Sequence, residues 1–180
     1  VSWDSIQFNQ WESYQKSDAV KFHSKLNPKL WNNEDLHDEV RLRLLDMAAD
    51  FKEFLGIKDL EVNDVTISGS NAAYNYTGNS DIDLHLVVDM PKLEADEVYR
   101  ELFTAKKYQY NDQHDYKIGN HEVELYVQPA TDQHHSQGIY SVQASDWRRV
   151  PSRKQPKIDD TSVRHKYEDL GARIETAVAS

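Results

Sequence analysis

GSNAAYNYTGNSDIDLHLVVD, residues 69–89, joins a Gly-Ser pair to an apolar segment that carries two aspartates near its start. Side chains two residues apart in a β-strand point to the same face of the sheet. Asp81, Asp83 and His85 therefore share one face of a strand predicted over residues 82–88, and the alternating apolar residues face the core. The stretch predicts a strand with one apolar face and one charged face.

Two carboxylates on one face of a strand repel each other, and clustering them without a partner is costly. Mg²⁺ binds a few carboxylate oxygens and leaves its other positions to water and to substrate phosphates. A pair of such ions can activate an attacking hydroxyl and stabilise a departing phosphate. Asp81 and Asp83 are therefore predicted to bind Mg²⁺ or Mn²⁺.

A second acidic pattern follows in HEVELYV, residues 121–127. Its apolar residues alternate with Glu122, Glu124 and Tyr126, so these three share the polar face of another predicted strand. If the two strands are neighbours, one glutamate completes a site of three carboxylates. We favour Glu124, which is flanked by apolar residues on both sides, and Glu122 stays open as the alternative.

The Gly-Ser pair suits a phosphate ligand. A glycine at the end of a strand lets the backbone approach a ligand closely, and the N–H groups that follow can bind phosphate, especially where a helix opens. Ser70 adds a hydroxyl and Asn71 an amide beside Gly69. Taken singly, each of these patterns also fits an ordinary turn or a solvated strand edge, but their joint occurrence favours a functional site.

The whole chain is typical of a mixed α/β (α+β) protein, with a small mixed sheet and helices packed mainly on one face. We predict helices over 8–24, 34–55, 91–107 and from 161, strands over 62–67, 82–88 and 139–142, and a hairpin of 115–118 with 121–128 around Gly119-Asn120. We expect an N-terminal extension over 1–33, a core over 34–149, and a loop arm with a C-terminal helix packing on the core over 150–180.

Composition limits the partners. The chain has 180 residues, a net charge of −10 and no cysteine. Proteins that grip long nucleic acids usually carry a basic face, so we expect no long duplex as substrate. Neither a membrane-spanning apolar run nor a signal peptide is found, so we expect a cytoplasmic protein without a membrane partner. The chain does not begin with Met, which is compatible with a processed or excised piece of a longer protein.

The densest basic group lies late in the chain, at Arg148, Arg149, Arg153, Lys154 and Lys157. Trp147 could stack on a base, and the two arginines that follow it could contact a triphosphate or the acceptor. A core tryptophan beside a solvated basic turn fits equally well.

Other aromatic and histidine residues carry weaker signals. Tyr74 and Tyr76 fit either the lining of a nucleotide pocket or the packing of their own loop. The spacing of the histidines at 114, 121, 134 and 135 matches no helix-borne zinc pair, and surface or loop positions account for them better.

Gly69-Ser70, ten residues, and then Asp81-Ile82-Asp83-Leu84 resemble the signature of the DNA polymerase beta-like nucleotidyltransferase superfamily, over about residues 60–128. The resemblance implies a nucleotidyltransferase fold, two Mg²⁺ ions, and transfer of a nucleoside monophosphate from ATP or another NTP with release of pyrophosphate. The fuller phrase from Gly69 to His85 is most similar to predicted nucleotidyltransferases of tailed bacteriophages.

The same resemblance implies roles for individual residues. Gly69 and Ser70 would hold the triphosphate, with Asn71 and Ser80 beside them in the nucleotide site. Asp81 and Asp83 would bind the metals, and Glu124 would be the third carboxylate, helping to deprotonate the acceptor hydroxyl. The acceptor itself, an RNA end, a small molecule or a protein, is left open because no second recognition domain follows.

Ser68 departs from the superfamily pattern, in which many members have an apolar residue before the glycine. Two other functions remain. One is a non-catalytic nucleotide-binding, metal-binding or interaction module of the same fold. The other is a (p)ppGpp-synthetase-like pyrophosphotransferase, to which Glu124-x-x-Val127-Gln128 has a faint similarity, but that group lacks the upstream Gly-Ser and the paired aspartates.

Overall fold

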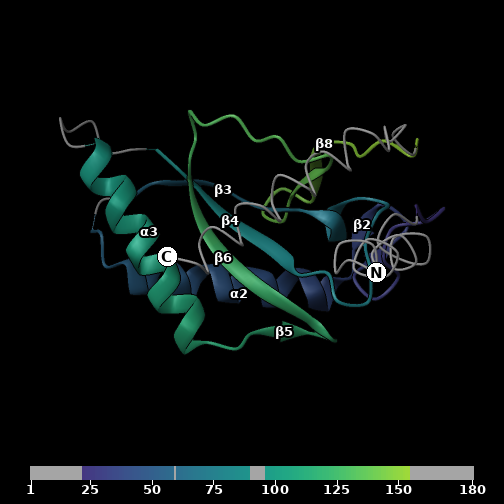
Figure 1. The fold of residues 1–180 in the computed structure, drawn as a ribbon, viewed down its shortest axis with the longest axis horizontal. Helices are drawn as coiled ribbons and strands as arrows, with labels where there is room; N and C mark the ends of the chain where they lie inside the picture. Colours follow the sequence, from purple (N-terminus) through teal and green to yellow (C-terminus); the bar gives the residue numbers. More distant parts are fainter. Residues whose placement is uncertain (1–21, 59, 90–95, 155–180) are drawn as a thin grey trace, which may run out of the picture.

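The computed structural model describes residues 22–58, 60–89 and 96–154 (Figure 1). The helix predicted from residue 161, nearly all of the one predicted over 8–24, and the predicted start of a helix at Pro91 lie outside these residues. Within them the chain forms two long α-helices and a mixed sheet, so the predicted mixed α+β class is confirmed.

The main sheet has six strands in the order β5-β6-β4-β3-β7-β8. The strand β4 pairs antiparallel with β3 and parallel with β6, which makes the sheet mixed as predicted. The strands are β3 (Val62–Ser68), β4 (Ile82–Val88), β5 (Lys117–Ile118), β6 (His121–Pro129), β7 (Ile139–Ser141) and β8 (Asp146–Arg149). Of these, β8 was not predicted, because a short edge strand of mostly exposed residues has no clear alternation.

The two helices pack together and against the apolar face of the sheet. The predicted helix over 34–55 is confirmed as α2 (Asp38–Leu55), and the left-handed Gly56 ends it as expected. The helix α3 (Asp96–Gln113) continues past the predicted end at Lys107. Contacts join α2 to α3 and β4, and α3 to β6 (Figure 1). No helix in the described part of the chain is long and apolar enough to cross a membrane.

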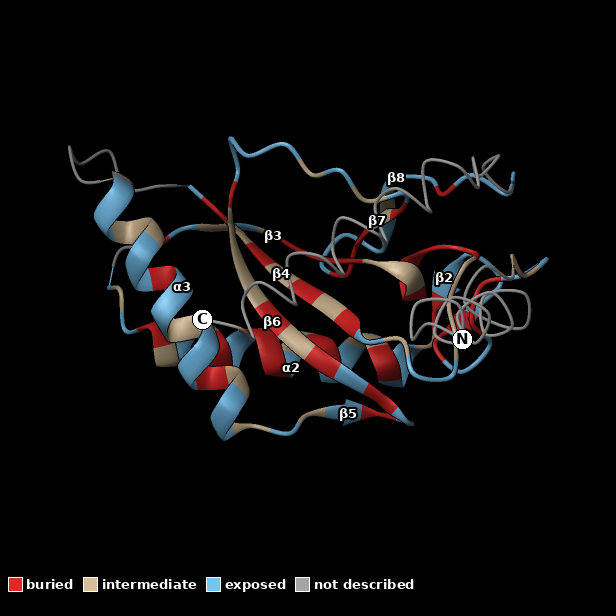
Figure 2. Cartoon of the chain, viewed as in Figure 1, coloured by how far each residue is buried: buried red, intermediate tan, exposed pale blue. Residues whose placement is uncertain are grey.

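Burial follows the predicted alternation along the two central strands (Figure 2). Ile82, Leu84 and Leu86 are buried, while Asp83 and His85 between them are half-buried. Leu125 is fully buried in the neighbouring β6. One face of the sheet therefore packs on the helices, and its opposite face carries the polar side chains.

The segment before α2 also belongs to the core. Its short hairpin comprises β1 (Trp31–Asn32) and β2 (Asp35–Leu36). Leu26, Leu30 and Trp31 are buried, so residues 22–33, which fall within the predicted N-terminal extension, contribute directly to the core. This segment reaches the loop after β3, because the Trp31 indole N–H donates to the carbonyl of Asn71 at 2.8 Å.

Candidate carboxylate site

The parallel pairing of β4 with β6 brings two predicted site residues together. Asp83 lies directly opposite Glu124 in the register of these strands, and Ser68 lies opposite Asp83 on the other side, in β3. Residues paired across adjacent strands point to the same face. The condition set for a shared carboxylate site, that the two acidic strands be neighbours, is therefore met.

Gly69 approaches the Asp83 side chain closely. Its backbone has φ 77° and ψ −166°, a conformation that is essentially restricted to glycine. A Cβ atom added to Gly69 would overlap the carboxylate oxygen Oδ2 of Asp83. The end of β3 thus lies against the β4 carboxylate, which joins the Gly-Ser pair to the acidic pattern in space.

The loop from Ser70 to Ser80 is closed by its own side chains. Ser70 begins a short 3₁₀ helix, η2 (Ser70–Ala72), and its hydroxyl donates to the Ser80 hydroxyl at 2.7 Å. The Thr77 backbone N–H donates to the same Ser80 oxygen at 2.9 Å. Both serines predicted to bind the nucleotide therefore hold the two ends of this loop together.

Asn71 is buried, with 1% of its surface exposed, and it binds this loop from the interior of the protein. Its amide donates to the carbonyls of Ser80 at 2.8 Å and Asp81 at 3.0 Å. Its own side-chain oxygen accepts from the amide of Asn27 at 2.9 Å. Asn71 thus shapes the backbone that carries Asp81, and its amide is engaged inside the protein.

His121 completes this buried network. Its Nδ1 lies 2.6 Å from the Ser80 carbonyl, and its Nε2 lies 3.0 Å from the Asn27 amide. With Nδ1 as donor and Nε2 as acceptor, one neutral tautomer satisfies both contacts. His121 is 1% exposed, so the expectation of a surface or loop position was wrong for this histidine.

The pKa values of the two aspartates, Asp81 and Asp83, are raised. The pKa of Asp83 is above its ordinary value because the side chain is buried and because Glu124 and Asp81 are negatively charged, while Lys107 acts in the opposite direction. Asp81 lies exposed just before β4, and its pKa is raised by partial desolvation and by the charges of Glu124 and Glu122. These carboxylates repel one another at one end of the sheet, and a cation bound there would relieve the repulsion.

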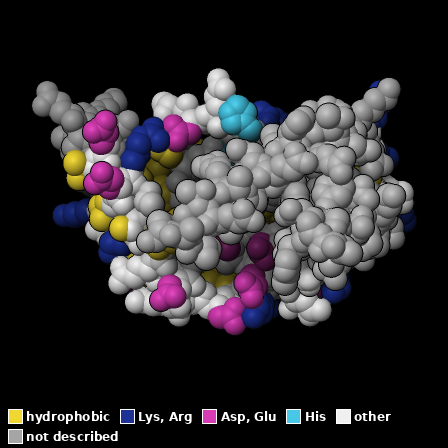
Figure 3. Space-filling model, viewed as in Figure 1, with side chains coloured by type: hydrophobic (Ala, Val, Ile, Leu, Met, Phe, Trp, Pro, Cys, Tyr) yellow, Lys and Arg dark blue, Asp and Glu magenta, His cyan; other side chains and the backbone are white. Residues whose placement is uncertain are grey.

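Of the two glutamates left open, Glu124 is the one in register with Asp83. It is half-buried and its Oε2 accepts a 2.5 Å hydrogen bond from the Tyr126 hydroxyl. Glu122 is exposed and lies 3.5 Å from the Lys117 ammonium. In Figure 3, acidic side chains gather on the surface near the position of β5 in Figure 1.

The next polar pair along the strands is His85 beside Tyr126. The two rings stack with centroids 4.9 Å apart, and the Ser68 hydroxyl lies 3.1 Å from His85 Nε2. Burial and the charges of His134 and Lys107 lower the pKa of His85 to about 3. His85 is therefore neutral near pH 7 and adds no positive charge beside the carboxylates.

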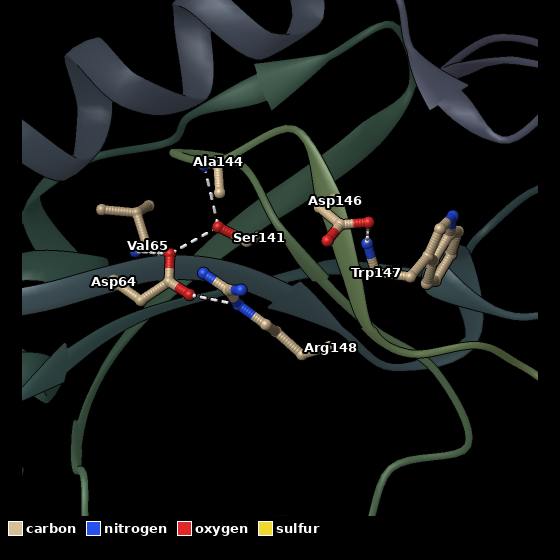
Figure 4. A network of polar contacts seen from close by, with 7 residues as sticks. All are labelled: Asp64, Val65, Ser141, Ala144, Asp146, Trp147 and Arg148. Atoms are coloured by element: carbon tan, nitrogen blue, oxygen red, sulfur yellow. Dashed lines mark hydrogen bonds and ion pairs between the residues drawn. The ribbon is translucent and has the colours of Figure 1, made fainter.

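Among the described residues, Arg148 and Arg149 make their side-chain contacts away from Asp81, Asp83 and Glu124. The Arg148 guanidinium donates to Asp64 Oδ2 at 2.8 Å, near the other end of β3 (Figure 4). The Arg149 guanidinium donates to the backbone carbonyls of His134 and Ser136. Both arginines hold segments of this protein together through these contacts.

The aromatic residues for which the sequence left two interpretations open make packing contacts within the protein. Trp147 stacks on the buried Trp31 with ring centroids 4.9 Å apart, and its indole N–H donates to the Glu34 carbonyl. Tyr74 is 3% exposed. Tyr76 stacks on His23 at 4.0 Å.

The types of residue at this site fit a divalent cation. Carboxylate oxygens are the ligands that Mg²⁺ and Mn²⁺ prefer, and Asp83 and Glu124 supply them from adjacent strands. Among the described residues, no three or more His, Asp or Glu side chains are grouped so that they could hold a metal ion. The hydrogen bond from Tyr126 uses one acceptor position of Glu124 Oε2, and the carboxylate has further lone pairs that could bind a cation.

Comparison with models of known protein families, with curated proteins and with solved structures finds no match for this chain.

Sequence reasoning did not single out Tyr126 and Lys107 as site residues, although Tyr126 was placed on the polar face of its strand. The Lys107 ammonium lies 3.8 Å from the centroid of the Tyr126 ring, and the Tyr126 hydroxyl binds Glu124. The alternation in residues 121–127 contained the signal for Tyr126. Lys107 is distant from the acidic patterns in the sequence, so only the packing of α3 beside β6 reveals it.

Proposed function

We propose that the protein is a metal-dependent nucleotidyltransferase of the DNA polymerase beta-like type. It would transfer a nucleoside monophosphate from an NTP to a hydroxyl acceptor. The observation that carries the proposal is that Asp83 lies opposite Glu124 in register and against the backbone of Gly69. Three segments that are separate in the sequence thus meet at one end of the sheet, in the combination that the resemblance implies.

The reaction assigned to the site is a single displacement at phosphorus. The acceptor oxygen forms a bond to the α-phosphorus of the NTP, the bond from that phosphorus to the bridging oxygen breaks, and pyrophosphate leaves. Glu124 takes the proton of the acceptor hydroxyl. Asp83 and Glu124, joined by Asp81 after a rearrangement of the side chains, would hold Mg²⁺ or Mn²⁺, which supplies charge neutralisation and Lewis-acid activation.

The remaining residues of the site position these groups. Gly69 lets the end of β3 lie against Asp83, because a side chain there would occupy the space of the Asp83 carboxylate. Ser70 and Ser80 fix the loop that leads from this glycine to the aspartates. Asn71 and His121 hold the same loop from inside. In this account they preorganise the site, and the carboxylates carry the chemistry.

Label transfer tests the proposal. The protein is incubated with each α-labelled NTP, Mg²⁺ or Mn²⁺, and pooled RNA, protein and small metabolites. We expect label in one acceptor class, a loss of at least about 100-fold in Glu124→Gln, and near-normal transfer in the matched control Glu122→Gln. Equal transfer by both variants would remove Glu124 from its assigned role.

A non-catalytic binding module is the second candidate, and the hydrogen bond that engages Glu124 with Tyr126 favours it. It predicts binding of Mn²⁺ or nucleotide without transfer of label from any NTP. The pyrophosphotransferase alternative predicts a third result, in which label moves only when it is placed in the β- or γ-phosphate.

A further inference from the structure

Lys107 is a cation held at the edge of the carboxylate site. It is half-buried on α3, and its ammonium lies 3.8 Å from the centroid of the Tyr126 ring and 5.2 Å from that of Tyr108. Tyr126 in turn donates to Glu124. A lysine over an aromatic face gains about 0.5–1 kcal/mol at exposed sites and keeps its N–H donors available.

The ammonium of Lys107 has no carboxylate within ion-pair distance and no hydrogen-bond acceptor among the residues that the structure describes. The other basic side chains on this side are engaged differently. Arg100 makes a two-pronged contact with Asp132 at 2.8 and 2.9 Å, and Arg149 binds backbone carbonyls. Lys107 is thus a partly buried cation whose donors face a space between elements.

That space is a pocket of about 250 Å³ between α3 and β6. Its lining includes Lys107, Arg100, Thr104, Tyr126 and the acidic Asp132. A second pocket, of about 320 Å³, shares Tyr126 and Asp132 with the first and is also lined by His85 and His134. The Arg100 guanidinium is paired with Asp132, the Thr104 hydroxyl donates to the Arg100 carbonyl and the Tyr126 hydroxyl donates to Glu124. Among the described residues of this lining, Lys107 is therefore the cation that makes no ion pair, in a chain with a net charge of −10.

We propose that the pocket between α3 and β6 binds a phosphate group through the ammonium of Lys107. The assignment of this phosphate to a nucleotide rests on the proposed function. An acidic site that takes a polyanion needs positive charge beyond its metal ions, and a lysine next to its carboxylates supplies it. The ammonium is a point charge with three donors, which suits the terminal phosphates of a nucleoside triphosphate.

Lys106 offers a matched control on the same helix. Its ammonium also lies over an aromatic ring, that of Phe54, at 4.8 Å, and it contacts the Phe54 carbonyl at 3.4 Å. Lys106 is half-buried like its neighbour but packs against α2. The two lysines thus share residue type, helix and aromatic contact and differ in the surface that they face.

The test is calorimetric titration of the full chain with tripolyphosphate and with ATP at low salt, after thermal unfolding has shown that each variant is folded. Lys107→Gln is expected to weaken tripolyphosphate binding about tenfold, since a charged hydrogen bond is lost. Lys107→Arg should retain most of the affinity, and Lys106→Gln should stay within about twofold of wild type. Absence of binding by the wild type, or equal losses in the two Gln variants, would overturn the inference.

Failure of the pocket and failure of the transferase proposal give different results. Mn²⁺ binding that depends on Asp83, together with unchanged tripolyphosphate binding in Lys107→Gln, rejects the pocket alone. Loss of tripolyphosphate binding in Lys107→Gln from a protein that transfers no label supports the phosphate pocket and rejects the transferase. ATP binding that is weakened while tripolyphosphate binding is unchanged also counts against the pocket.

Discussion

Asp64 and Asp83 lie on the same face of the same sheet, yet their surroundings are opposite. Asp64 accepts hydrogen bonds from the Ser141 hydroxyl at 2.5 Å, the Val65 N–H at 2.9 Å and the Arg148 guanidinium at 2.8 Å (Figure 4). Asp83 lies opposite Glu124 in the register of β4 and β6, and burial together with the nearby carboxylates raises its pKa. Asp64 is thus surrounded by hydrogen-bond donors, whereas Asp83 lies close to other negatively charged side chains.

This difference separates a structural carboxylate from a candidate functional one. A buried acid with donors on every side contributes to the stability of the folded protein. Like charges collected at one place cost stability, and proteins keep such arrangements mainly where a ligand relieves them. The comparison predicts that the two ends of the sheet respond to substitution in opposite ways.

The largest expected effect on stability comes from Gly69→Ala. The strained backbone conformation and the overlap with Asp83 together should cost about 3 kcal/mol in the free energy of unfolding. Gly119→Ala is the matched control, because Gly119 has φ 62° but an added Cβ would contact nothing within 4 Å. It should cost only about 1 kcal/mol. Urea unfolding measures both, and equal costs would refute the close approach of Gly69 to Asp83.

The next effect is that of Asp64→Asn. This change removes a carboxylate that is only 13% exposed from its contacts with Arg148 and Ser141, so we expect a loss of about 2 kcal/mol. Arg148→Ala combined with Asp64→Asn in a double-mutant cycle should show coupling of about 1 kcal/mol. Additive losses would mean that this contact contributes little.

The stability of the protein should depend on pH through His85, with an effect smaller than that of Asp64→Asn and larger than that of Asp83→Asn. Its pKa is about 3 in the folded protein against 6.5 for an unperturbed histidine, so the unfolded state takes up the proton first as the pH falls. Its stabilising contribution is present above pH 6.5 and is lost below it. Wild type should lose about 1.4 kcal/mol relative to His85→Gln between pH 7.5 and 5.5. A constant difference across this range would show that His85 titrates normally.

Asp83→Asn should give the smallest change and the opposite sign. The pKa of Asp83 is raised in the folded protein, so its contribution to stability is present below the ordinary carboxyl value of 3.8 and is lost as the pH rises through the raised value. Removing the charge should therefore stabilise the protein by about 1 kcal/mol at pH 7. The gain should disappear below about pH 3.8. Destabilisation at pH 7 would place Asp83 in the same structural class as Asp64.

The sequence was sufficient for the faces of β4 and β6, because strict alternation fixes which side chains are buried together. It also indicated that the glycine-serine pair and the aspartates belong together. The contacts of Lys107 with Tyr126 and of His121 with the Ser80 carbonyl could not be predicted, since they join segments far apart in the chain. Arg148 shows the same limit, because the sequence shows its charge and does not show that Asp64 accepts its hydrogen bond.

Binding of Mn²⁺ tests the central claim most directly. Free Mn²⁺ is followed by electron paramagnetic resonance during titration of wild type, Asp83→Asn and the matched control Asp64→Asn at pH 7. Wild type and Asp64→Asn are predicted to bind the ion with similar affinity, and Asp83→Asn should bind it at least about tenfold more weakly. Equal binding by the Asp83 variant and wild type, or no binding by wild type, would contradict a metal site at these carboxylates.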